Sequence, residues 1–273
     1  MALFKSDDKT GIFYEQWDAP SARAALLLVH GLGAHSGRWH SSADFFTRQG
    51  FSCYALELQG FGQTRGLRGH IDSFETYFNG LHRLNGIIRD ELPGRKIFLV
   101  GESFGGLLSF LLAFKSPELF SGLICLSPAF SIKLQVSFWD YTRVFLHLFL
   151  DQQKQFKLHL VGDMCTRDIK YQEQIDHDFR EHPLVSARFV LNYFQAERAA
   201  RRMAMPLLLP VLFLIPGQDT IVSSHISKVI FYRLLARDKT LIKYPEMFHA
   251  LSVELGKEKV FADMLQWLNA RLV

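Results

Sequence analysis

Cysteine is scarce in this sequence, with three cysteines among 273 residues, Cys53, Cys125 and Cys165. The odd number leaves at least one thiol outside any disulfide, and the spacing matches no set of metal ligands. Cys53 and Cys125 stand in apolar segments that resemble buried strands. We therefore expect inert thiols in a reducing compartment, which favours a cytoplasmic location.

Long hydrophobic runs are also missing. The longest, around residues 144–150 and 207–215, fall well below the roughly 20 residues that a membrane-spanning helix needs. The first residues, MALFKSDDKTGIF, place charges where a signal peptide has its apolar core. We expect neither a transmembrane segment nor a secretory leader.

A strong excess of one charge is absent too, because the net charge is +4 and the basic residues are spread along the chain. We therefore expect no nucleic-acid partner. A weak attraction to anionic membrane surfaces stays open. Hydrophobic residues make up 48% of the chain, as in ordinary globular proteins. The length fits one domain that carries an insertion.

Short apolar runs alternate with segments of helical period, which is typical of a mostly parallel sheet with helices on both faces. An α/β fold is therefore expected. The runs predict core strands at 24–29, 53–58, 97–100, 123–126, 211–215 and 241–244, with an edge strand at 12–17. The helical patterns predict helices at 36–49, 73–91 and 104–115.

This alternation stops after Ser127-Pro128. The following stretch contains no convincing core strand but has helical patterns at about 137–152, 168–179 and 185–203. It is too long for a plain loop in a compact domain. We interpret residues 129–205 as a helical cap inserted into a core domain of residues 1–128 and 206–273. The alternative is a set of ordinary helices that pack on the sheet.

The strongest local signal is the G-x-S-x-G motif at residues 101–105, between the expected strand 97–100 and an apolar helix. A sharp turn from strand to helix strains the serine, and the flanking glycines leave room for the close backbone approach. The motif predicts Ser103 as a nucleophile. The alternative is a serine that merely caps the helix. We expect the neighbouring Glu102 to be a solvated carboxylate.

A nucleophilic serine needs a base, usually a histidine that a carboxylate holds in the right tautomer. Asp219 follows the expected strand 211–215, and His249 follows the expected strand 241–244. Because the carboxyl ends of parallel strands share one edge of the sheet, Asp219 can reach His249. The alternatives are an aspartate that caps a helix and a loop histidine near solvent.

The segment His30-Gly31-Leu32-Gly33 directly follows the expected strand 24–29. Oxyanion-hole donors in such an arrangement come from this loop and from the residue after the nucleophile. We therefore predict the backbone N–H groups of Leu32 and Phe104 as donors, and we expect His30 to brace the loop through hydrogen bonds. The glycines at 60–66 lack the spacing of a dinucleotide-binding motif, so no cofactor or metal is expected.

With these residues in place, the chain resembles the monoacylglycerol lipase and lysophospholipase branch of the α/β-hydrolases. The similarity covers nearly the whole length. Residues 30–38, HGLGAHSGR, resemble that family's H-G-x-G-x-H-S-x-R segment, and further similar segments lie at 60–64, 127–128, 217–219 and 245–249. The chain departs from the family's common G-H-S-M-G at Glu102 and Phe104, from its serine at Thr64, and from its acid-x-Arg-Gly stretch at 57–60.

The resemblance implies an α/β-hydrolase fold and hydrolysis of a single-chain lipid ester through an acyl-enzyme. The expected cap contains an apolar stretch that would line an acyl channel, touch a membrane peripherally or pack on the core: Phe138, Trp139, Tyr141, Val144, Phe145, Leu148 and Phe149. The alternatives are a lysophospholipase, an esterase or amidase of small soluble substrates, and a binding protein without activity. Substrate-binding residues and oligomeric state are not indicated.

Overall fold

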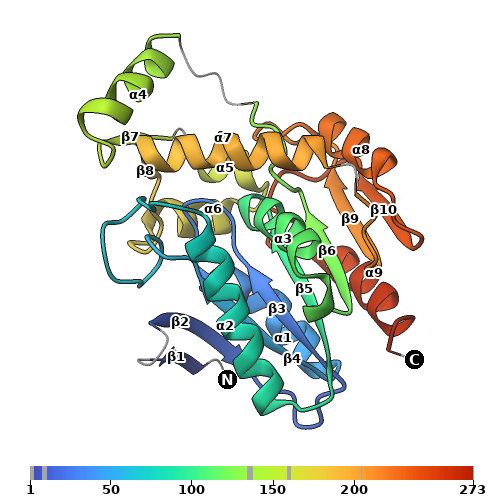
Figure 1. Cartoon of the computed structure of the whole chain (residues 1–273). Helices are drawn as coiled ribbons and strands as arrows, with labels where there is room; N and C mark the ends of the chain where they lie inside the picture. Colours follow the sequence, from blue (N-terminus) through green and yellow to red (C-terminus); the bar gives the residue numbers. More distant parts are fainter. Residues whose placement is uncertain (1–2, 8–10, 134–137, 159–160, 204, 273) are drawn as a thin grey trace.

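A central sheet of eight strands organises the molecule (Figure 1). The structure is a computed structural model that describes residues 3–7, 11–133, 138–158, 161–203 and 205–272. In spatial order the strands are β1 (Leu3–Asp7), β2 (Ile12–Trp17), β4 (Phe51–Glu57), β3 (Ala24–Val29), β5 (Lys96–Glu102), β6 (Gly122–Leu126), β9 (Val211–Pro216) and β10 (Lys239–Tyr244).

All pairings from β4 to β10 are parallel, whereas β1 pairs with β2 and β2 with β4 in antiparallel fashion. The predicted mostly parallel sheet is therefore confirmed, and each predicted core strand is present. The prediction that residues 12–17 form an edge strand is wrong, because Leu3–Asp7 pairs along the outer side of β2. The five-residue β1, LFKSD, is too short and too polar to show strand periodicity on its own.

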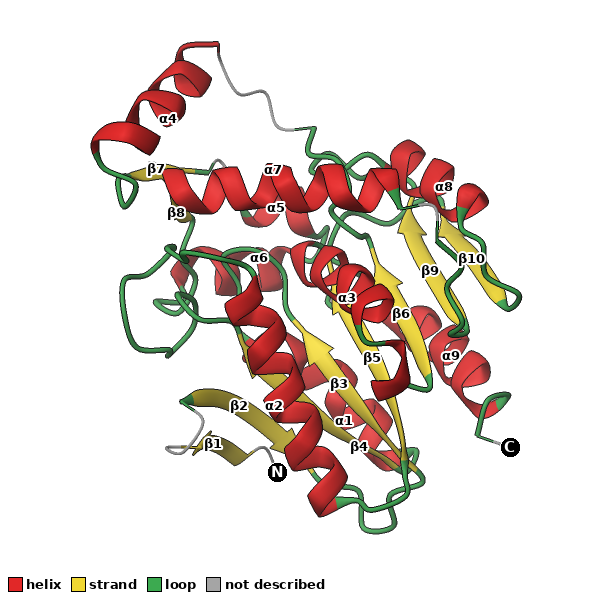
Figure 2. Ribbon diagram, in the orientation of Figure 1, coloured by secondary structure: helices red, strands yellow, loops and turns green. Residues whose placement is uncertain are grey.

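Helices cover both faces of the sheet (Figure 2). The predicted helices correspond to α1 (His40–Arg48), which a short 3₁₀ turn at Ser36–Trp39 precedes, α2 (Glu75–Glu91) and α3 (Phe104–Lys115). Two further helices, α8 (Ser224–Arg233) and α9 (Lys257–Asn269), follow β9 and β10. The fold class predicted for the chain is that of the structure.

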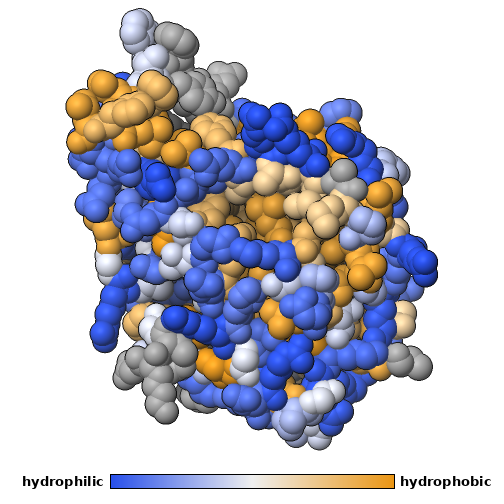
Figure 3. Space-filling model, in the orientation of Figure 1, coloured by the Kyte–Doolittle hydropathy of each residue, from blue (hydrophilic) through white to orange (hydrophobic). Residues whose placement is uncertain are grey.

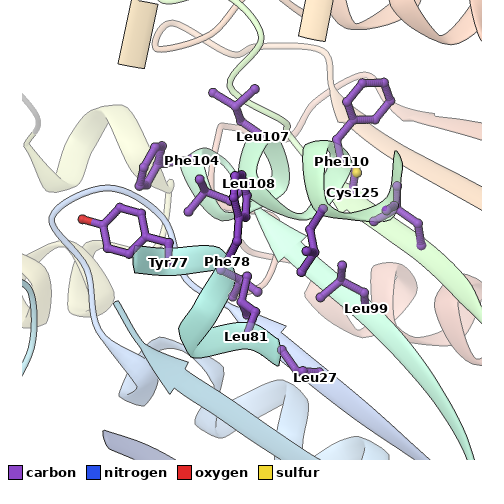
Figure 4. Close-up of a cluster of buried hydrophobic side chains, with 14 of the residues drawn as sticks. Leu27, Tyr77, Phe78, Leu81, Leu99, Phe104, Leu107, Leu108, Phe110 and Cys125 are labelled. Atoms are coloured by element: carbon purple, nitrogen blue, oxygen red, sulfur yellow. The ribbon is translucent and has the colours of Figure 1, made fainter. Parts of the chain in front are cut away.

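The two hydrophobic clusters of the core divide along each strand by alternation. On β3, Ala25, Leu27 and Val29 belong to the cluster under α2 and α3, whereas Leu26 and Leu28 belong to the cluster with α1 and α9. Figure 4 shows the first cluster, with side chains from α2, α3 and the sheet. Burial on both faces is why these strands are continuously apolar instead of alternating with polar residues.

The segment between β6 and β9 contains α4 (Phe138–Leu150), α5 (Gly162–Cys165), α6 (Ile169–His177) and α7 (Ala187–Arg202). Its described residues add no strand to the central sheet, but β7 (Gln155–Lys157) and β8 (Leu184–Ser186) form a small antiparallel pair that the sequence did not indicate. Figure 1 shows α7 crossing above the carboxyl ends of the strands. Positions 134–137, 159–160 and 204 of the predicted cap lie outside the described residues.

Backbone hydrogen bonds join this segment to the loops above the sheet. The N–H of His182 donates to the Gly33 carbonyl at 2.8 Å, and the N–H of Ser186 donates to the Gly69 carbonyl at 2.8 Å. Within the segment, the side-chain hydroxyl of Tyr193 on α7 donates to the carbonyl of Ala129, just after β6, at 2.8 Å. The part of the segment that contains β8 and α7 is therefore held over the end of the sheet where the predicted site residues lie.

All three thiols are free, and Cys53 and Cys125 are buried in the sheet. Burial raises the pKa of each, that of Cys165 to about 11, so the thiols stay protonated at neutral pH. Across the described ranges, no helix has the length and apolar character required to cross a membrane.

Candidate active site

Ser103 lies at the turn where β5 passes into α3, with φ of 57° and ψ of −117°. This backbone conformation is strained for a residue with a side chain, and it matches the predicted turn from strand to helix. A Cβ on Gly105 would collide with the carbonyl oxygen of Val29. Only glycine at position 105 therefore allows α3 to begin this close to β3.

A chain of hydrogen bonds joins the three predicted side chains. Nε2 of His249 lies 2.8 Å from Oγ of Ser103, and Nδ1 of His249 lies 2.8 Å from Oδ2 of Asp219. The other carboxylate oxygen, Oδ1, accepts from the N–H groups of Ile221 at 2.9 Å and Val222 at 2.8 Å. Three strand ends, those of β5, β9 and β10, thus bring a serine, a histidine and an aspartate together.

Burial and charge act in opposite directions on this pair. Burial alone would lower the pKa of His249, but the Asp219 carboxylate, together with Glu102, outweighs burial and holds the pKa above its ordinary value. Burial would raise the pKa of Asp219, but His249 and the two backbone N–H groups bring it below its ordinary value. Asp219 is therefore ionised at neutral pH, and His249, with 5% of its surface exposed, is no solvent-facing loop residue.

The predicted oxyanion donors lie at the same place. Leu32 and Phe104 both line the cavity that contains Ser103, and a methyl group on Gly31 would touch Cβ of Ser103 at 3.3 Å. Phe104 is the first residue of α3, where helix geometry leaves N–H groups without an acceptor inside the helix. The assignment of these two N–H groups as donors stays a prediction.

His30 braces this loop as expected. Its Nε2 accepts the N–H of Leu58 at 3.0 Å, so Nδ1 carries the proton and donates to the Gly31 carbonyl at 2.8 Å. Burial lowers the pKa of His30 to about 4. The imidazole therefore stays neutral and retains both hydrogen bonds at neutral pH.

The side chain of Phe104 is buried in an aromatic cluster instead of being exposed. Its ring lies 5.2 Å from that of Phe74, 5.9 Å from Tyr77 and 5.3 Å from Phe189, measured between ring centroids. Figure 4 shows Phe104 beside Tyr77. Because Phe189 belongs to α7, this cluster packs the segment above the sheet directly against the residue after Ser103.

The prediction that Glu102 is a solvated carboxylate is wrong. Its exposed fraction is 7%, and its Oε1 and Oε2 accept from the N–H of Ser252 at 2.9 Å and from its hydroxyl at 2.7 Å. Burial raises the pKa of Glu102, and the two bonds from Ser252 oppose that shift. Ser252, in the loop after His249, covers Glu102 although the two residues are 150 positions apart in the chain. The sequence around position 102 therefore contains no sign of this contact.

A cavity of about 310 Å³ opens at Ser103 and His249, a size within the range of small-molecule sites. Its lining includes polar and apolar residues. The polar ones include Arg38, Asp178 and Glu181, and Nε of Arg38 donates to Oε1 of Glu181 at 2.7 Å. The apolar lining includes Ala129, Ile132, Leu158, Val161, Tyr193, Ile221 and Val222. The sequence did not indicate these residues, because they come together from distant segments.

The model of the family described as serine aminopeptidase, S33 (Hydrolase_4), matches residues 20–256 of this chain. The monoacylglycerol lipase of Mycolicibacterium smegmatis is 24% identical over 96% of this chain and 94% of its own length. An uncharacterized abhydrolase domain-containing protein of Dictyostelium discoideum is 24% identical over 98% of this chain, which spans 28% of that longer protein.

Among solved structures, the monoacylglycerol lipase of Paleococcus ferrophilus matches with a TM-score of 0.85 and 24% identity. The match covers 95% of this chain and 99% of that protein. At this level of identity, the likeness shows that the two proteins share one fold.

Proposed function

The chain belongs to the serine aminopeptidase S33 family of serine hydrolases, and from this membership we propose that it hydrolyses single-chain lipid esters, as a monoacylglycerol lipase does. The observation that carries the proposal is the cavity at Ser103 and His249, which is lined by both apolar and polar residues. A monoacylglycerol combines one apolar acyl chain with a polar alcohol, which matches such a cavity in kind.

In the proposed reaction, Oγ of Ser103 attacks the ester carbonyl while Nε2 of His249 accepts the hydroxyl proton. The N–H groups of Leu32 and Phe104 stabilise the oxyanion that forms. His249 then donates the proton to the leaving alcohol, and the acyl group remains on Ser103. A water molecule, deprotonated by His249, releases the fatty acid and restores the serine. Asp219 holds the Nδ1 proton of His249 throughout.

A series of nitrophenyl esters from acetyl to octanoyl tests the lipid specificity. Each buried CH₂ group contributes about 0.8 kcal/mol, so we expect kcat/KM to rise by about 10-fold or more along the series. Parallel assays with 1-monoacylglycerol, lysophosphatidylcholine and an aminoacyl arylamide separate the alternatives. A preference for the acetyl ester, or for the arylamide, would contradict a lipid esterase, and a preference for lysophosphatidylcholine would indicate a lysophospholipase.

We further propose that α4 makes peripheral contact with a membrane surface. Phe145, Leu146, Phe149 and Leu150 are between 52% and 75% exposed, and the two phenylalanine rings lie 5.3 Å apart. Figure 3 shows the resulting apolar patch at the upper left, over α4. An exposed helical face of this kind is typical of interfacial helices. The side chains of Phe138 and Tyr141, from the same predicted stretch, lie outside the described residues.

Replacing both Phe145 and Phe149 with serine is expected to weaken binding to phosphatidylcholine/phosphatidylserine vesicles by about 10-fold or more, because each buried phenylalanine contributes about 1.5–3 kcal/mol. Cosedimentation measures the binding. Tyr232→Ser, which removes an equally exposed aromatic ring from α8, serves as the control and should bind as the unaltered protein does. Equal binding by the double variant, or no binding by the unaltered protein, would refute the membrane contact.

A further inference from the structure

Glu102 connects the segment that contains Ser103 to the loop that contains His249. It is the last residue of β5 and is bonded directly to Ser103. Both of its carboxylate oxygens accept hydrogen bonds from Ser252, which lies three residues after His249. One buried side chain therefore connects the turn that bears the serine to the loop that bears the histidine.

Other contacts fix the histidine loop elsewhere. Oε2 of Glu254 accepts the N–H of Phe248 at 2.9 Å, and the Ser127 hydroxyl donates to the His249 carbonyl at 2.6 Å. The N–H of Ala250 donates to the Cys165 carbonyl at 2.8 Å. These contacts hold the loop to itself, to the residue after β6 and to α5. The contact between Glu102 and Ser252 differs from these because it joins the loop to the residue directly before Ser103.

A carboxylate at this position is costly unless it is well bonded, because removing a charge from water carries a large desolvation penalty. Glu102 is almost fully buried, and Ser252 supplies both a backbone and a hydroxyl donor to it. The exposed fraction of Ser252 is 1%. The contact is therefore shielded from water, and a hydrogen bond to a charged group in such a place is stronger than a neutral one.

We propose that Glu102 is a positioning residue, which acts through Ser252 to hold Nε2 of His249 within hydrogen-bond distance of Oγ of Ser103. This inference rests on the proposed roles of Ser103 and His249. The Glu102 carboxylate also helps to raise the pKa of His249 through space. The positioning role adds a geometric function to that electrostatic effect. The Asp219 carboxylate contacts His249 directly, whereas the hydrogen bonds of Glu102 lead to the loop.

Four variants test the proposal: Glu102→Ala, Glu102→Gln, Ser252→Ala and the double variant Glu102→Ala/Ser252→Ala. A misplacement of about 1 Å can cost about 100-fold in rate, so we expect Glu102→Ala to lower kcat for a nitrophenyl ester by roughly 10- to 100-fold, with KM changed less than about 2-fold. Glutamine can accept the Ser252 N–H and donate to its hydroxyl, so Glu102→Gln should restore kcat to within about 3-fold.

Ser252→Ala removes one of the two bonds and should lower kcat by an intermediate factor of roughly 3 to 10. The double variant should lose no more than Glu102→Ala alone, because residues that act through one contact are not additive. Ser109→Ala is the matched control. It removes a buried hydroxyl from α3 that has no hydrogen-bond partner among the described residues, and kcat should not change.

The rate of fluorophosphonate labelling, followed beside ester hydrolysis and thermal unfolding, separates the possible failures. An unlabelled, inactive wild-type protein would contradict the proposed function. If the wild-type protein is labelled and Glu102→Ala has the same kcat as the wild type, the positioning role alone is overturned.

A Glu102→Gln variant with a kcat as low as that of Glu102→Ala would show that the charge matters instead of the contact. If the loss of kcat in the double variant equals the product of the two single losses, Glu102 does not act through Ser252. If Glu102→Ala unfolds, an unchanged kcat in Ser252→Ala also overturns the proposal.

Discussion

Ser103→Ala is expected to lower kcat for ester hydrolysis by about 10⁶-fold, the scale of loss found when the nucleophile of a serine hydrolase triad is removed. The reason is chemical, because without Oγ no acyl-enzyme forms and water must attack the ester directly. The oxyanion donors and the cavity would remain, so a small residual rate above the uncatalysed reaction is expected. Steady-state rates with octanoyl nitrophenyl ester measure the change.

The fold should be unaffected by that replacement, since the strained turn depends on Gly105 and on the close approach of β3 and not on the hydroxyl. Ser109→Ala, a buried serine six positions further along, provides the control and should retain full activity. A Ser103→Ala protein with kcat within about 10-fold of the wild type would show that another residue performs the chemistry, because loss of a triad nucleophile is expected to cost about 10⁶-fold.

Asp219→Asn is expected to lower kcat by about 10⁴-fold while the protein keeps its fold, the size of effect that follows from a wrong histidine tautomer. Oδ1 of Asp219 accepts two backbone N–H groups, so the asparagine oxygen will occupy that position. The amide NH₂ group will then face Nδ1 of His249. Nδ1 must lose its proton to accept from the amide, which leaves a proton on Nε2 and prevents it from accepting one from Ser103.

The same replacement should also lower the pKa of His249, because the Asp219 carboxylate makes the largest contribution that raises this pKa against burial. Asp90→Asn, which alters an exposed carboxylate on α2, is the control for the loss of one negative charge. A kcat for Asp219→Asn that equals that of Asp90→Asn would exclude Asp219 from the catalytic machinery.

Much of the fold was predictable because its signals are local. Ser103 and Asp219 follow strands that are buried on both faces, and His249 follows the partly buried β10, whose apolar centre still predicts a strand. Parallel strands place their carboxyl ends at one edge, so three distant positions converge without any knowledge of tertiary contacts. The brace at His30 was predictable for the same reason, since its loop follows β3 directly.

The remaining features depend on contacts between distant segments. Glu102 is solvated or buried according to where the loop around Ser252 folds, and nothing near position 102 indicates that. The apolar lining of the cavity includes Ile132 and Val222, which pair in a single antiparallel bridge although 90 positions separate them in the chain. The short strands β7 and β8, of three residues each, are below the length at which alternation is recognisable.

The segment between β6 and β9 also contacts the loops that position the triad. Nζ of Lys133 donates to the Asp219 carbonyl at 2.7 Å, and the Cys165 carbonyl accepts the N–H of Ala250 at 2.8 Å. The loops of Asp219 and His249 are thus held by this segment as well as by the strands that precede them. This arrangement explains why a segment that adds no strand to the central sheet nevertheless belongs to the geometry of the site.

The central claim is that Ser103 is the nucleophile of a hydrolase. The most direct test is to map the residue that a fluorophosphonate probe modifies. The purified protein is treated with the probe, digested and analysed by tandem mass spectrometry. We predict a single modified peptide with the adduct on Ser103, loss of ester hydrolysis in proportion to labelling, and no labelling of Ser103→Ala. An adduct on a different residue, or labelling that persists in Ser103→Ala, would contradict the account.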